Sequence, residues 1–374
     1  SKSSPPDNYL MKAFLALVLL LDLFPHKNAF ILPSSFRTSG GDITRHAVLS
    51  SSKEHAEEDD SYDVVVVGSG IGGLSSAAML AKYGYSVLVL ESHSEAGGAA
   101  HGFTLRVPKV GNFDFDTGPS FFSGLNPSFP AKASNPLRTV LDAVDESVEC
   151  EVYKSFGLVF PEGSNLIHSS NFGRSGGVID ELMGEEGISQ WTRVMNEMEP
   201  LAAVVDALPT AAIRTDIGAP FTVGPYLKNF AKLNPLNNLK LTKPFQSILD
   251  DSKIPANGFV QRWLDLLCFC LSGLPAKGTI AAEMALMLGE FYSDDAIMDC
   301  PRGGAKSIVQ ALVRGIEKYG GTLRTKSHVD EIIVEDGRAV GVKLRKDGRV
   351  FRAKKAVVSN LSVWDLFGKS GLIK

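Results

Sequence analysis

The stretch that decides the fold runs from Asp63 to Gly73 and reads D-V-V-V-V-G-S-G-I-G-G. Its first part, up to Val67, is a run of β-branched residues, which predicts a parallel strand buried on both faces. In the glycine-rich part, Gly68 allows a tight turn and Gly70 lets the backbone approach a pyrophosphate. Gly73 lets the following helix pack closely on the strand. The motif therefore predicts the start of a dinucleotide-binding unit.

The residues after the glycine turn supply the other parts of such a unit. Residues 71–83 carry small apolar side chains, typical of a helix packed closely on a sheet, and Gly84 is suited to end it. A second strand is expected over residues 86–90. It ends in Glu91, 18 residues beyond Gly73, where a carboxylate can accept hydrogen bonds from ribose hydroxyls and disfavours the 2′-phosphate of NADP. A strand, a glycine turn, a helix, a second strand and a terminal acid follow one another at the expected spacing, which makes the prediction of a dinucleotide-binding unit strong. A GxGxxG pattern without the other parts would be weak evidence for it.

A second glycine pair indicates which dinucleotide is bound. Gly97 and Gly98 lie a few residues past Glu91, and without Cβ atoms they let backbone N–H groups approach an anion. Taken alone, the pair has a less favoured alternative, an ordinary surface turn. Together with the first motif it resembles the E…GG signature of the amine-oxidase and phytoene-desaturase flavoproteins, in which this turn runs beside the FAD phosphates. The resemblance implies that the cofactor is FAD.

Three further segments narrow the resemblance. Residues 113–120, FDFDTGPS, are similar to an F-D-x-G-x-S segment of carotenoid isomerases and bacterial-type phytoene desaturases. Residues 301–305, PRGGA, resemble the P-x-G-G segment of these proteins, and residues 357–368, VVSNLSVWDLFG, look like the ending of the carotenoid isomerases. From about Tyr62 to its last residue, the chain is thus similar, with gaps, to the family of carotenoid isomerases, phytoene desaturases and retinol saturases.

The resemblance implies a set of cofactor-binding residues. They are Gly68, Ser69, Gly70, Ile71, Gly72, Gly73, Glu91, Gly97, Gly98 and Val329. Val329 is included because its counterpart in the family contacts adenine through its backbone. No catalytic side chain is assigned, because the flavin carries polyene chemistry. We expect His101 and His168 to be bystanders.

The composition fits a globular protein with a sizeable core. The chain has 374 residues, a net charge of −4 and 44% hydrophobic residues, enough for one large or two modest domains. The near-neutral charge gives no electrostatic reason to expect a nucleic-acid partner. Because the four cysteines lack the paired spacing of a zinc site, no metal is expected. Cys268 and Cys270 lie in an apolar run, and we expect both to be buried, inert thiols.

The pattern predicts an α/β protein in which a Rossmann-type FAD-binding domain contains an inserted α+β substrate domain. Residues 62–150 and 291–374 form the first and second parts of the FAD-binding domain, and residues 151–290 form the insertion. The insertion should contain a hairpin over 151–160 and 166–169, and helices over 178–183, 190–208, 258–272 and 279–291. The apolar faces of these helices are either core or the lining of a tunnel for a long hydrocarbon. In the family a C-terminal glycine-rich segment closes the flavin fold, and here we expect it to be missing.

Residues 1–61 differ in composition from the rest and are expected to be a targeting presequence followed by an acidic linker. The apolar run 13–21 suits the core of a signal peptide, and residues 31–53 have the Ser-rich, basic composition of a plastid transit peptide. This predicts a plastid protein, with a secreted or ER-resident protein as the alternative. Residues 220–245 interleave aromatic and basic side chains, which suits a peripheral membrane contact as well as a solvated loop.

The predicted function is that of an FAD-dependent oxidoreductase-type enzyme of carotenoid biosynthesis. The resemblance favours cis–trans isomerisation of a poly-cis carotene, a long polyene substrate. The alternatives are a carotenoid desaturase or saturase, an amine-oxidase-like flavoenzyme, and a carrier of prenyl lipids without enzymatic activity. Intact glycines and Glu91 argue against the carrier, because such relatives tend to lose the tight flavin site. The electron partner is left open.

Overall fold

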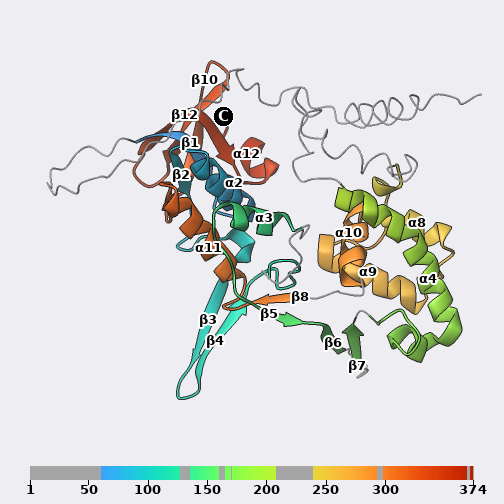
Figure 1. The fold of residues 1–374 in the computed structure, drawn as a ribbon. Coiled ribbons are helices and arrows are strands. Elements are labelled where there is room, and N and C mark those ends of the chain that lie inside the picture. Colours follow the sequence, from blue (N-terminus) through green and yellow to red (C-terminus); the bar gives the residue numbers. More distant parts are fainter. Residues whose placement is uncertain are drawn as a thin grey trace, which may run out of the picture.

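A six-stranded sheet with the strand order β10-β11-β12-β1-β2-β9 joins strands from residues 61–90 and 322–359 (Figure 1). It is seen in a computed structural model that describes residues 60–126, 135–159, 165–169, 171–207, 239–292, 298–368 and 371–373. Its strands are β1 (Ser61–Val67), β2 (Val87–Leu90), β9 (Thr322–Arg324), β10 (Val329–Glu335), β11 (Arg338–Leu344) and β12 (Val350–Ser359). The predicted Rossmann-type α/β fold is confirmed.

Strand β1 lies inside the parallel part of this sheet. It pairs in parallel with β12 on one side and β2 on the other, and β2 pairs in parallel with β9. Strand β11 lies between β10 and β12 and pairs antiparallel with each of them. The carboxyl ends of β12, β1 and β2 therefore meet at one edge, where ligands of open α/β sheets bind.

The two faces of β1 are covered by different layers. Helices α2 (Ile71–Lys82), α3 (Pro136–Ala143) and α11 (Ala305–Lys318) share a buried cluster with Val64 and Val66. Val65 and Val67 point the opposite way and pack with Phe351 of β12. Successive strand residues alternate between faces, so a strand covered on both sides needs apolar side chains at every position.

The other described residues form short strand pairs and a group of helices (Figure 1). The remaining elements are η1 (Gly98–Ala100), β3 (Gly102–Val107), β4 (Gly111–Asp116), β5 (Cys150–Tyr153), β6 (Ser155–Val159), β7 (Asn165–Ser169), α4 (Val178–Ala207), α8 (Phe245–Asp251), α9 (Phe259–Ser272), α10 (Ala281–Phe291), β8 (Met298–Pro301) and α12 (Val363–Phe367). Strands β6 and β7 form a hairpin, but β5 pairs with β8. The predicted hairpin was therefore wrong in its first half, because local pattern does not reveal a partner strand far along the chain.

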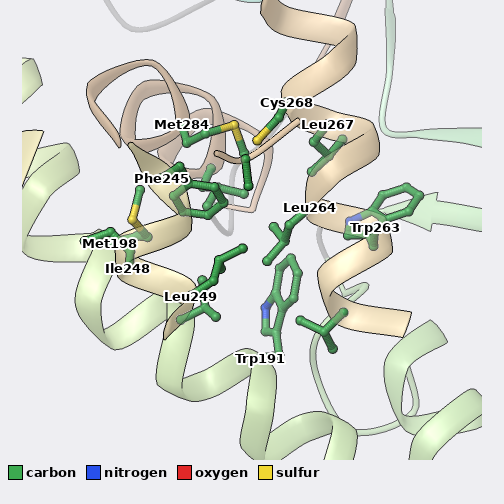
Figure 2. Close-up of a cluster of buried hydrophobic side chains, with 14 of the residues drawn as sticks. Trp191, Met198, Phe245, Ile248, Leu249, Trp263, Leu264, Leu267, Cys268 and Met284 are labelled. Atoms are coloured by element: carbon green, nitrogen blue, oxygen red, sulfur yellow. The ribbon is translucent and has the colours of Figure 1, made fainter. Parts of the chain in front are cut away.

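Helices α4, α8, α9 and α10 pack their apolar faces on one another (Figure 2). Helix α4 joins the two helices predicted over 178–183 and 190–208 through a kink at Gly184, where φ is 61°. Phe245 of α8 ends the stretch 220–245, for which an exposed membrane contact or a solvated loop was predicted, but it is 0% exposed in this core. That prediction was wrong for Phe245, whereas residues 220–238 lie outside the described part. None of the described helices is long and apolar enough to cross a membrane.

The two cysteines of α9 have different environments. Cys268 is buried, as predicted, and burial raises the pKa of its thiol to about 12. Cys270 is exposed, so its predicted burial was wrong. Cys268 and Cys270 are two residues apart, which corresponds to a rotation of roughly 200° about the axis of an α-helix. The two side chains therefore lie on opposite sides of α9.

His168 of β7 is a buried imidazole surrounded by aromatic rings. It is 1% exposed and stacks on Phe156 and Trp263 at centroid distances of 4.4 Å and 5.7 Å. Among the residues that the structure describes, neither ring nitrogen has a hydrogen-bond partner. Burial lowers the pKa of His168 from 6.5 to about 4, so the ring is neutral at pH 7.

His168→Phe is expected to make the protein less sensitive to acid. Between pH 6.5 and about 4, the unfolded chain binds a proton at this residue that the folded chain does not. The free energy of unfolding should therefore fall by about 2 kcal/mol between pH 7 and pH 5 through His168 alone. Urea denaturation at both pH values should show this loss in the wild type and not in the variant. His93→Phe, at an exposed imidazole, should keep it; an equal loss in His168→Phe would contradict the prediction.

Candidate functional site

The glycine turn joins the carboxyl end of β1 to the start of α2. Gly68 has a φ of 92°, which favours glycine, and its N–H donates to the Leu90 carbonyl at 2.8 Å. A Cβ at Gly73 would collide with the carbonyl oxygen of Gly68. Gly70 has an ordinary φ of −62°, so any residue could adopt its backbone. Glycine is therefore required at position 70 by the lack of room for a side chain above the turn, and not by the backbone conformation.

The turn presents the N-terminus of α2. Gly70 is the N-cap of this 12-residue helix, and among the described residues no side chain caps it. The first backbone N–H groups of a helix have no partner inside the helix, and the helix dipole adds positive potential there. A helix N-terminus of this kind can bind a phosphate group when glycines leave it free of side chains. The residues present therefore fit the pyrophosphate of a dinucleotide.

Glu91 ties this turn to the end of β2. Its carboxylate, 8% exposed, accepts hydrogen bonds from the Ser69 N–H at 3.0 Å and the Ser69 hydroxyl at 2.5 Å. The other carboxylate oxygen accepts from the His93 N–H at 2.8 Å. Burial alone would raise the pKa of Glu91, but the hydrogen bonds from His93 and Ser69 outweigh it and the pKa is lowered. Glu91 is thus an ionised carboxylate that holds Ser69 in place.

The second glycine pair lies directly on the first turn. Gly97 forms a β-bridge with Gly70, and its N–H donates to the Ser69 carbonyl at 3.0 Å. A Cβ at Gly97 would lie 2.8 Å from a methyl group of Val309 in α11. A Cβ at Gly98 would lie 3.1 Å from the Cα of Gly70. The structure therefore brings both predicted glycine motifs together and gives the second one a packing role that spacing did not reveal.

Val329 begins β10 close to the same edge. The segment before it hydrogen-bonds to the residues after β2, with the Ser327 N–H donating to the Glu91 carbonyl at 2.7 Å. The Lys326 N–H likewise donates to the His93 carbonyl at 2.8 Å. Val329 itself is 6% exposed. Its predicted contact with adenine stays a prediction.

Two segments that carry the family resemblance also meet beside the glycine pair. Asp116, at the end of β4, accepts a hydrogen bond at 2.7 Å from the Ala305 N–H, the first residue of α11. Asp116 thus caps a helix that begins far along the chain, a role that sequence reasoning missed because no local signal marks it. Thr117 donates to the His101 carbonyl, and the His101 ring lies 2.6 Å from the Gly98 carbonyl oxygen. In the described part of the chain no group of three His, Cys, Asp or Glu residues could hold a metal ion.

Comparison with known proteins agrees with this geometry. Residues 66–134 match the NAD(P)-binding Rossmann-like domain family. The chain is 28% identical over 333 residues to prolycopene isomerase 1, chloroplastic, of an Oncidium hybrid cultivar, covering 84% of the chain and 50% of that protein. It is 27% identical over 340 residues to the all-trans-retinol 13,14-reductase of Rattus norvegicus, covering 86% and 51%. The chain spans about half the length of the curated relatives it matches. The expected resemblance to carotenoid isomerases and retinol saturases is confirmed.

Solved structures share the fold. An oxidoreductase from Methanosarcina mazei superimposes with a TM-score of 0.51 at 20% identity, over 80% of this chain and 58% of that one. Putrescine oxidase superimposes with a TM-score of 0.51 at 18% identity, over 80% and 57%. At these identities the likeness shows the fold alone.

Proposed function

We propose that the protein is an FAD-dependent enzyme acting on the double bonds of a carotenoid. Its chain resembles prolycopene isomerases and retinol reductases over most of its length. Cis–trans isomerisation of a poly-cis carotene is the reaction we favour. The observation that carries the proposal is the junction of the glycine turn, Glu91 and the Gly97-Gly98 pair at one sheet edge. Both relatives act, by their names, on conjugated polyenes.

In this proposal each part of the site has one task. The N–H groups at the start of α2 bind the pyrophosphate, with Gly70 leaving room for it. Glu91 accepts a hydrogen bond from a ribose hydroxyl while it holds Ser69. Val329 contacts adenine through its backbone. FAD, when bound, supplies the exchange of electrons with the polyene, so that the side chains have only to bind, orient and exclude water.

The remaining assignments follow from the same proposal. Residues 151–290 form the substrate domain and bring the polyene to the flavin. Residues 1–61 direct the protein to the plastid, and the support is their composition together with the chloroplastic relatives. A polyene is collected from a lipid surface, so we propose a peripheral contact with the plastid membrane. The partner that supplies electrons is not assigned.

Purified full-length protein is expected to show the two visible absorption bands of oxidised flavin. Cofactor released by denaturation should be FAD. The holoprotein is then given poly-cis carotene in liposomes, under oxidising and under reducing conditions. Isomerase activity yields a product of unchanged mass, whereas a desaturase removes two hydrogens and a saturase adds two. A folded, colourless protein that cannot be loaded with FAD would overturn the proposal and favour the lipid carrier.

A further inference from the structure

Asn360 lies beside the glycine turn because two parallel strands end together. Strand β12 pairs with β1 in a register that places Ser359 opposite Val67. The next residue, Asn360, donates its backbone N–H to the Val67 carbonyl at 2.9 Å. The first residue beyond β12 is therefore anchored at the point where the Gly68 turn begins.

The side chain of Asn360 extends over the first turn of α2. A Cβ at Gly70 would lie 2.5 Å from its Nδ2, and a Cβ at Gly72 would lie 2.8 Å from its Oδ1. A Cβ at Gly73 would lie 3.1 Å from the Cβ of Asn360. Gly70 and Gly72 thus face the carboxamide of Asn360, and Gly73 faces its Cβ, so that the side chain crosses the surface that a pyrophosphate would approach.

The Asn360 carboxamide is available to a ligand. The residue is exposed, and its side chain makes no hydrogen bond within the described ranges. A carboxamide carries two N–H donors, and hydrogen bonds donated to a phosphate oxygen are charge-assisted. The neighbouring helix terminus favours an anion at the same place.

We propose that Asn360 is a pyrophosphate-binding residue of the dinucleotide site, donating from Nδ2 to a phosphate oxygen. The inference rests on the proposed FAD function and deepens it by adding a ligand from β12 to those of the glycine turn. In the competing explanation, Gly70 and Gly72 lack side chains only to make room for Asn360, which then serves packing alone.

Asn360→Ala removes the donor, whereas Asn360→Asp keeps the shape and replaces the donor by an anion, and the two variants together separate these explanations. Repulsion of the pyrophosphate should raise the Kd for FAD by about 100-fold, and Asn360→Ala should raise it by about tenfold. Without FAD, the aspartate stands at a helix N-terminus, where a negative charge is stabilising. The melting temperature of the apoprotein should therefore stay unchanged or rise, which loss of packing would not produce.

The experiment titrates full-length apoprotein with FAD, follows the change in flavin fluorescence at two salt concentrations, and records the melting temperature of each apoprotein. Asn112→Asp, the same change at an exposed position of β4, is the matched control and should bind FAD like the wild type. Equal Kd values for wild type, Asn360→Asp and Asn360→Ala would overturn the role of Asn360 and leave the proposed function standing. A folded wild type that binds no FAD would overturn both.

Discussion

Gly70→Ala is expected to weaken FAD binding by about 100-fold while changing the free energy of unfolding of the apoprotein by less than about 1 kcal/mol. The backbone of Gly70, with φ of −62°, accepts alanine without strain. The new methyl group meets only the end of the exposed Asn360 side chain, which can turn aside. It nevertheless occupies the space through which, in the proposed site, the pyrophosphate approaches the turn. Titration of apoprotein with FAD and urea denaturation measure the two effects.

Gly73→Ala provides the contrast. Its Cβ would collide with the Gly68 carbonyl oxygen, a backbone atom that cannot move without displacing the turn. We expect the free energy of unfolding to fall by about 3 kcal/mol. Gly157→Ala, where a Cβ meets nothing within 4 Å, serves as the control and should change neither quantity. Wild-type FAD affinity in Gly70→Ala would show that the ligand does not approach the turn at this point.

Glu91→Gln is expected to lower the free energy of unfolding by about 2–3 kcal/mol and to weaken FAD binding as well. The carboxylate accepts from two backbone N–H groups, those of Ser69 and His93. A glutamine amide offers only one oxygen, so its NH₂ group must face one of these donors in a buried place. Urea denaturation of the apoprotein at pH 7 measures the loss.

The lowered pKa of Glu91 adds a pH dependence with a definite sign. A carboxyl whose folded pKa lies below its unfolded value contributes stability above the unfolded pKa. That contribution is lost as the pH falls through the folded pKa. Glu91→Gln should therefore abolish this part of the decrease in the free energy of unfolding at low pH. Glu95→Gln, the same change at an exposed carboxylate, should stay within about 0.5 kcal/mol of the wild type. A Glu91→Gln protein as stable as the wild type would refute the anchoring role.

Features that depend on short stretches of chain could be predicted. The run Asp63–Val67, the glycine turn and the helix after it obey rules of strand burial and turn conformation that act within a few residues. Strand β2 and α2 accordingly begin or end within one residue of the predicted limits of 86 and 83.

Features that depend on distant partners could not be predicted in this way. The pairing of β5 with β8 joins strands far apart in the chain, and the cap that Asp116 provides for α11 does the same. Phe245 is buried in the core because α8 packs against other helices. Its neighbours in the sequence, which are basic and aromatic, had instead indicated a loop. In each case the structure is stabilised by contacts between residues far apart in the chain, which no short stretch of sequence contains.

By itself the sequence determined the Rossmann unit, its glycines and the acid at the end of the second strand, because the conformation of a tight turn and the space around it admit few residue types. Only the tertiary structure decided which groups surround that turn. The register of β12 against β1 places Asn360 over Gly70, and the bridge between Gly70 and Gly97 seats the second glycine pair on the first. These contacts arise because parallel strands end at a common edge, whatever their separation along the chain.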